Sequence, residues 1–185
     1  MGLLIFSTNV TLDGCVDHQE GIADNETHAF FTRLMDESGA MLWGRVTYEM
    51  MESYWPAVAR GEAEVPPPMR EWAVKLDAKP KYVVSSTRND FPWNNSHHIA
   101  GDLRTGVQNL KGATPAGVLL GSGKLAAELD RLDLIGTSTS SSFTPGSSAT
   151  APLYTRAACR ARDSSNWFRR SRSATALLLC TTDAL

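Results

Sequence analysis

Long apolar runs, paired cysteines and an excess of positive charge are all lacking in this sequence of 185 residues. No run approaches the roughly 20 apolar residues of a membrane-spanning helix, so we expect no membrane association. A net charge of −2 argues against a nucleic-acid-binding protein, which usually carries a basic stripe. Three scattered cysteines, Cys15, Cys159 and Cys180, are too few for a disulfide framework or a metal site, and they indicate reduced thiols in a cytoplasmic protein. The first residues lack a basic segment and a small-residue cleavage site, so they predict no secretory signal.

Amino-acid usage changes abruptly after residue 135. Residues 1–135 carry 12 Lys and Arg against 18 Asp and Glu, whereas residues 136–185 carry six Arg against two Asp. This tail contains no Lys, Glu, Val, Ile, Met, Gln or His, and 18 of its residues are Ser or Thr. It lacks the alternating β-branched or aromatic residues of a strand and, before a short ALLLC, the apolar stripe of a core helix. We therefore predict a folded domain over residues 1–135 and a poorly ordered tail over residues 136–185.

Short apolar runs alternate with amphipathic segments throughout the first part of the chain. The predicted strands lie within residues 3–10, 40–44, 81–87, 97–101 and 116–123. The predicted helices run from Asp24 or Asn25 to Gly39, over 45–55 up to Pro56, and over 66–78, 102–112 with Asp102 as N-cap, and 124–134, with a loop over 57–65. Most of the strands are continuous apolar runs, which is typical of strands buried on both faces. The pattern predicts an α/β sheet with helices on both faces.

Polar residues follow three of the predicted strands. In open α/β sheets, ligands bind beyond the carboxyl ends of the strands, and the free N–H groups at the start of a following helix favour anions. The three sets are Gly44, Arg45 and Thr47; Ser85, Ser86 and Arg88; and Gly121, Ser122 and Gly123. Three such sets in one chain predict a nucleotide ligand with several phosphates.

Each set also has a purely structural interpretation. A glycine turn before a helix is often structural, Arg45 could pair with Glu49 four residues later, and Arg88 could be an ordinary loop residue. The sets match neither the G-x-x-x-x-G-K-[ST] of a P-loop nor a G-x-G-x-x-G after the first strand.

Four motifs in this order, VTLDG, GRVTYE, YWP and GSGKLAAEL, resemble the dihydrofolate reductase-like family over residues 3–135. The closest similarity is to its bacterial branch related to the C-terminal reductase domain of riboflavin biosynthesis. The resemblance implies a mixed, mainly parallel sheet with helices on both faces, a homodimer, and NADPH-dependent reduction of a small heterocyclic or carbonyl substrate. It places Gly44, Arg45 and Thr47 at the cofactor phosphates, Ser85, Ser86 and Arg88 at the adenosine 2′-phosphate, and Gly121, Ser122 and Gly123 at the pyrophosphate.

The sequence differs from the folate reductases at a position that is expected to contact the substrate. These resemble one another in a carboxylate on the first long helix, a position that falls near His28 here, with Asp24 and Glu26 a turn away. A histidine cannot offer two acceptors to the N–H pair of a pterin, so we do not expect folate as the substrate. His28 and Asp13 are candidate polar groups at the substrate; the alternatives are a solvent-facing helix residue and an Asp-Gly turn. We identify no catalytic acid, and the cofactor supplies the hydride chemistry.

The tail contrasts with the resembling reductases, in which RLDLI continues into an acidic-aromatic strand and a final hairpin. With freely chosen codons and a skip of two nucleotides after Ile135, one translation of the tail resembles that missing C-terminus throughout. We interpret the tail as the product of a frameshift; the alternative is a natural low-complexity extension. Two further functional alternatives are a non-catalytic nucleotide-binding module and an inactive product whose fold lacks its last strands.

Overall fold

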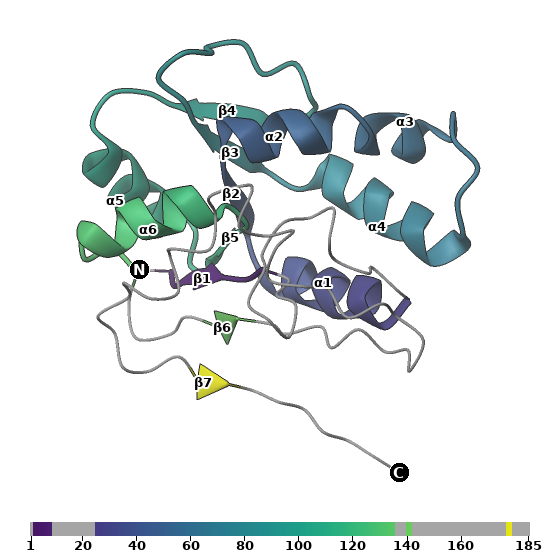
Figure 1. Cartoon of the computed structure of the whole chain (residues 1–185), viewed down its shortest axis with the longest axis horizontal. Helices are drawn as coiled ribbons and strands as arrows, with labels where there is room; N and C mark the ends of the chain where they lie inside the picture. Colours follow the sequence, from purple (N-terminus) through teal and green to yellow (C-terminus); the bar gives the residue numbers. More distant parts are fainter. Residues whose placement is uncertain (1, 9–24, 136–139, 142–176, 179–185) are drawn as a thin grey trace, which may run out of the picture.

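A computed structural model describes residues 2–8, 25–135, 140–141 and 177–178 of the chain. Five of its strands form one sheet in the order β1-β5-β2-β3-β4 (Figure 1). They are β1 Leu4–Phe6, β2 Ala40–Gly44, β3 Lys81–Val84, β4 Ser96–Ile99 and β5 Val118–Leu120. Every pairing described within this sheet is parallel, which confirms the predicted α/β class with a mainly parallel sheet.

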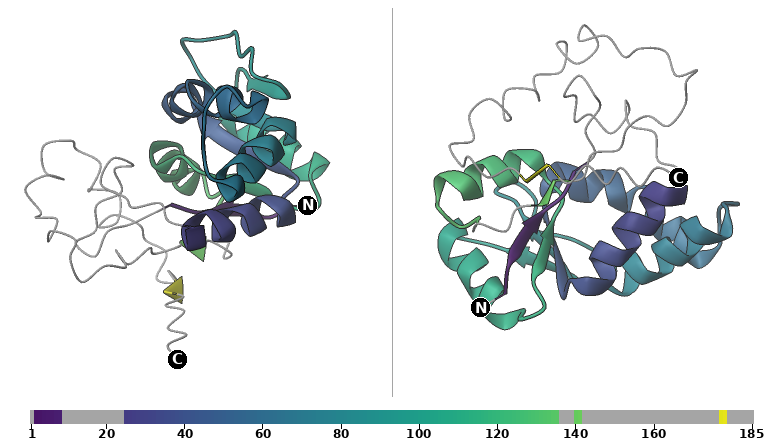
Figure 2. Two further views of the ribbon diagram at one scale, coloured as in Figure 1. Left: turned by 90° about the vertical axis from the view of Figure 1, so that its right-hand side faces the viewer. Right: turned by 90° about the horizontal axis from the view of Figure 1, so that it is seen from below.

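Helices cover both faces of this sheet, as predicted. They are α1 Asn25–Glu37, α2 Arg45–Glu52, α3 Trp55–Arg60, α4 Pro67–Ala78, α5 Leu103–Ala113 and α6 Gly123–Arg131. Helices α1 to α4 lie on one face, and α5 and α6 lie on the other (Figure 2).

The two cores follow from the alternation of side chains along the strands. In β2, Leu42 is fully buried against the apolar side chains of α5 and α6, whereas Met41 and Trp43 point to the opposite face and join those of α1, α2 and α4. Because both faces are covered, the central strands need apolar residues at every position. This requirement explains the continuous apolar runs in the sequence.

The segment after β2 differs from the prediction of one helix ended by Pro56. Two helices form there, and Pro56 lies in the first turn of α3, where a missing N–H costs no helical hydrogen bond. Helix α3 ends at Gly61, whose φ of +80° is left-handed and suits glycine. The predicted loop is therefore wrong over residues 57–60, because the proline begins a helix instead of ending one.

Helix α5 packs unusually closely on β4. The predicted N-cap is confirmed: the Asp102 carboxylate accepts a hydrogen bond from the Thr105 backbone N–H at 2.9 Å. One turn into the helix, a Cβ atom on Gly106 would lie 2.5 Å from Cγ2 of Ile99. Glycine at this position therefore allows the close approach, which brings the start of α5 beside the carboxyl ends of β3 and β4.

Only short pieces of the tail are described. Strands β6 Ser140–Ser141 and β7 Leu177–Leu178 pair in parallel with each other and form a sheet separate from the five-stranded one. The remainder of residues 136–185 lies outside the described residues, so the expected poor order and the frameshift stay predictions. Asp13 also lies outside the described residues. Among the helices that are described, none has the length and apolar character needed to cross a membrane.

Candidate functional site

The three predicted sets of polar residues meet at one edge of the sheet. They follow β2, β3 and β5, which are neighbouring parallel strands, so their carboxyl ends point the same way. Helix α2 leaves β2 on one face of the sheet, and α6 leaves β5 on the other (Figure 2). Such a divergence between adjacent strands is the usual location of a ligand crevice in open α/β sheets.

Ser122 joins the first and third of these sets directly. Its hydroxyl oxygen accepts a hydrogen bond from the Gly44 backbone N–H at 2.9 Å, and its O–H donates to Oγ1 of Thr47 at 2.7 Å. Ser122 is buried, with 5% of its surface exposed. Its side chain therefore ties the start of α2 to the start of α6.

Replacing Ser122 with alanine is expected to lower the free energy of unfolding by about 1–2 kcal/mol, because the Gly44 N–H loses its acceptor in a half-buried place. Urea denaturation of both chains measures the change. Ser86→Ala, the same substitution at an exposed serine of the same edge, serves as the control and should unfold like the wild type. Equal stability of all three chains would contradict a role for Ser122 in joining the helices.

Two glycines at these helix starts could carry a Cβ atom without a clash. Gly44 has an ordinary extended conformation, with φ −79° and ψ 160°, and a Cβ on it would meet its nearest atoms at 3.9 Å. A Cβ on Gly123 would meet no atom within 4 Å. Neither backbone strain nor packing within the protein demands glycine there. In contrast, a Cβ on Gly121 would lie 3.1 Å from Nε1 of Trp43, so packing accounts for that glycine.

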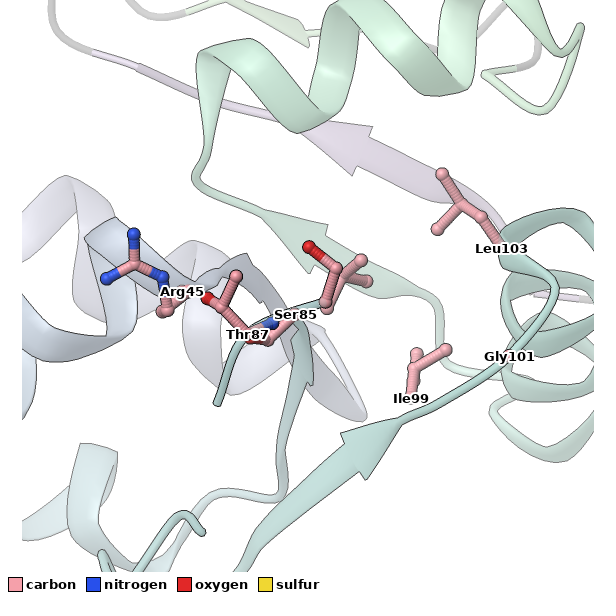
Figure 3. A pocket seen from close by; sticks show the side chains of 8 residues that line it. Arg45, Ser85, Thr87, Ile99, Gly101 and Leu103 are labelled. Carbon is pink, nitrogen blue, oxygen red and sulfur yellow. The ribbon is translucent and has the colours of Figure 1, made fainter. Parts of the chain in front are cut away.

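A cavity of about 470 Å³ opens at the carboxyl ends of β3 and β4 (Figure 3). Its lining residues are Arg45, Val84, Ser85, Ser86, Thr87, Ile99, Gly101 and Leu103. Arg45, Ser85 and Thr87 lie on one side, and Ile99 and Leu103 lie on the other (Figure 3). The cavity thus combines one cation and several hydroxyls with an apolar wall, at the starts of α2 and α5.

The structure brings three of the predicted residues, Arg45, Ser85 and Ser86, into this cavity. The other predicted residues do not line it: Gly44, Thr47, Arg88, Gly121, Ser122 and Gly123. Thr87, Gly101 and the apolar lining residues were not singled out from the sequence. Gly101 could have been found, because it stands between a strand and a capped helix, as the glycines of the other sets do.

Hydrogen bonds fix the loop that follows β3. The Ser85 hydroxyl accepts from the backbone N–H groups of Arg88 at 2.8 Å and Thr87 at 3.2 Å, a local turn in which the side chain replaces a backbone acceptor. The Ser85 carbonyl oxygen lies 2.9 Å from Nε2 of His98, which therefore donates. The Ser85 hydroxyl thus shapes the loop, while Ser86 and Thr87 are more exposed and also line the cavity.

Arg88 points toward helix α2. Its guanidinium donates to both carboxylate oxygens of Glu52, at 2.8 and 3.1 Å, and lies over the rings of Tyr48 and Phe91 at 5.4 and 5.3 Å. The hydrogen bonds to Glu52 raise the pKa of Arg88 above its ordinary value. Contact of Arg88 with a cofactor phosphate stays a prediction, and it would require this arginine to leave Glu52.

Arg45 lines the cavity and also forms the ion pair that was its structural alternative. Its Nη1 atom lies 2.7 Å from Oε2 of Glu49, and the two side chains are 40% and 38% exposed. The second oxygen of the same carboxylate, Oε1, lies 3.6 Å from Nη1 of Arg88. Glu49 therefore stands between the two arginines that the sequence assigned to phosphates.

His28 lies away from this cavity, on α1. Its ring is edge-on to Trp55 and Trp72, with ring centroids 6.3 and 6.2 Å away. His28 is half-buried against these rings, so it faces the solvent only in part, and its contact with a substrate stays a prediction. The buried Nε1 of Trp72 has no hydrogen-bond partner within the described part of the chain.

Comparison with known proteins shows a shared fold. No family model matches the chain, and no curated protein matches it. A protein from Shewanella sp. PV-4, named as a riboflavin biosynthesis protein, has a solved structure similar to 77% of this chain and 76% of its own, with 19% identity and a TM-score of 0.53. The riboflavin biosynthesis reductase Rib7 of Saccharomyces cerevisiae aligns over 80% of this chain and 74% of its own, with 15% identity and a TM-score of 0.44. The first similarity supports the fold expected from the sequence motifs.

Proposed function

We propose that this chain is an NADPH-dependent reductase of a small heterocyclic or carbonyl substrate other than folate. The observation that carries the proposal is the cavity that joins Arg45 to the hydroxyls after β3 at the carboxyl edge of the sheet. The fold shared with a riboflavin biosynthesis protein adds to it. At this identity the similarity concerns the fold, so the activity rests on the site.

The residues at this edge fit the phosphate-bearing part of a dinucleotide. Arg45 offers a guanidinium, and the start of α2, which has no side-chain cap, borders the same cavity, where free backbone N–H groups favour anions. Val84, Ile99 and Leu103 offer an apolar wall to a flat ring. The open space over Gly123 suits the close approach of a pyrophosphate to the backbone.

NADPH, when bound, supplies a hydride, and the protein mainly has to hold and orient it. Arg45, Ser86 and Thr87 would hold its phosphates, and the Ser122 link would keep the starts of α2 and α6 in place. On the substrate side, His28 cannot offer a carboxylate to a pterin, because an imidazole has no second acceptor oxygen. This is the reason for excluding folate.

A thermal melt with about a millimolar NADPH, and NADH beside it, tests binding. A ligand that binds the native state with micromolar affinity should stabilise it by about 4 kcal/mol and raise the melting temperature clearly. We expect this rise with NADPH and a smaller one with NADH, which has one phosphate fewer for the cationic cavity. A transition indifferent to both nucleotides would contradict the proposal and would favour the inactive product.

Turnover separates the reductase from the non-catalytic alternative. NADPH oxidation is followed in the presence of carbonyl and pterin-like compounds, with a compound-free sample as the control. Binding of NADPH without oxidation by any compound would indicate a nucleotide-binding module.

A further inference from the structure

The charged side chains beside the cavity form an alternating row along α2. Arg45 contacts Glu49, Glu49 reaches Arg88 with its second oxygen, and Arg88 is held by both oxygens of Glu52. The row contains two cations and two anions. The positive charge of Arg45 is thus matched by a neighbouring carboxylate.

Arg45 is the charged side chain that borders the cavity, among the residues that the structure describes. Its guanidinium lies on the side away from Ile99 and Leu103 (Figure 3), and its Nη1 is bound to Glu49. A half-exposed ion pair of this kind contributes little to stability, so it can be exchanged for another partner at small cost. A phosphate entering the cavity is such a partner.

We propose that Glu49 determines ligand specificity by competing with the ligand phosphate for Arg45. The carboxylate carries one negative charge and two acceptor oxygens. A doubly charged phosphomonoester carries more charge and three acceptor oxygens, so it can displace Glu49 from Arg45. A neutral or singly charged group gains little by the same exchange. Glu49 thereby selects ligands with a terminal phosphate, an inference that rests on the proposed function for naming NADPH as that ligand.

The test is Glu49→Gln, which keeps the shape of the side chain and removes its charge. Titration calorimetry at constant ionic strength measures the affinities for NADPH and for inorganic pyrophosphate. The competing ion pair is exposed and weak, so we expect both ligands to bind about two- to fivefold more tightly to the variant.

Glu128→Gln is the matched control. It makes the same charge change at an exposed glutamate, but its partner is Arg131 at the end of α6, and neither residue lines the cavity. We expect this variant to bind both ligands like the wild type. In a chain that also carries Arg45→Ala, Glu49→Gln should have no effect on binding, because the guanidinium for which Glu49 competes is absent.

Three outcomes would overturn the inference. Weaker binding by Glu49→Gln would mean that Glu49 positions Arg45 for the ligand, and equal tightening by both glutamine variants would mean a long-range charge effect. Absence of pyrophosphate and NADPH binding in every chain would also overturn it. Tighter pyrophosphate binding by Glu49→Gln alone, with no binding of NADPH, would sustain the competition and refute the proposed function.

Discussion

Replacement of Lys81 with methionine is expected to lower the free energy of unfolding by about 3 kcal/mol. Lys81 begins β3 and is fully buried. Its ammonium group donates to the carbonyl oxygens of Leu76, Asp77 and Lys79 at 2.9, 2.9 and 2.8 Å, and lies 4.6 Å from the ring centroid of Trp93. The three acceptors lie at the carboxyl end of α4, where the helix dipole favours a cation.

Methionine fills similar space but cannot donate. The Asp77 carbonyl keeps a donor in Nδ2 of Asn94 at 3.3 Å, but the carbonyls of Leu76 and Lys79 lose the ammonium group. Each buried carbonyl left without a donor costs about 1–3 kcal/mol, and release of the cost of burying a charge offsets part of this sum. Urea denaturation near pH 7 measures the change. Lys75→Met is the control, because Lys75 lies on α4, whose end supplies the acceptors of Lys81, but forms exposed ion pairs with Asp36 and Glu71. A Lys81→Met chain as stable as the control would contradict this role of Lys81.

The wild type and Lys81→Met chains are also expected to differ in the pH dependence of their free energy of unfolding. Burial lowers the pKa of Lys81 to about 8, and the Asp77 carboxylate partly opposes that shift. In the unfolded chain the pKa is near 10.4, so between about pH 8 and pH 10.4 the unfolded state binds more protons than the folded state. Stability from this group therefore rises with pH across that window. We expect the stability difference between wild type and Lys81→Met to grow there, by up to about 3 kcal/mol.

Replacement of Arg45 with alanine is expected to weaken NADPH binding about 10- to 100-fold. A hydrogen bond between charged groups contributes about 1.5–3 kcal/mol, and each 1.4 kcal/mol corresponds to a factor of ten in affinity. Arg45 is the cation that lines the cavity within the described residues, and the neighbouring Arg88 is held by both oxygens of Glu52. Titration calorimetry with NADPH and pyrophosphate measures the loss.

Arg104→Ala is the control for this variant. Arg104 follows the lining residue Leu103, is exposed and does not line the cavity, so its removal changes the net charge equally without touching the site. We expect near-normal affinity for it. Similar losses in the two variants would show that only overall charge matters. The stability of Arg45→Ala should stay close to that of the wild type, because its ion pair with Glu49 is half-exposed.

The elements of the sheet could be predicted well because burial on both faces leaves a strong mark on the sequence. The AMLWG run becomes β2, whose residues 40–43 are all buried. The Asp102 cap could be predicted because the required side chain and the helix start are neighbours in the chain. Pro56 was misread because a proline can either end one helix or begin the next, and its position alone does not distinguish the two.

The candidate site could be predicted in part because some of its residues directly follow predicted strands in the chain. Strand ends carrying Arg45, Ser85 and Ser86 could be recognised locally, and the parallel order of β2 and β3 places them together. The burial of Lys81 could not be predicted, since a lysine at the start of a strand is ordinarily exposed. Its acceptors lie only two to five residues earlier, at the end of α4, but its burial depends on the place of β3 between β2 and β4 in the sheet.

The sequence by itself determined the α/β class, most of the elements and three anion-suited strand ends, because apolar periodicity, caps and glycine turns are local properties. Only the tertiary structure decided which of these residues share a cavity and which bind one another. Ser122 turned inward to Gly44 and Thr47, and Glu49 came to stand between Arg45 and Arg88. Such partnerships depend on strand order and on the faces from which helices leave the sheet, and these are set by packing of segments distant in the chain.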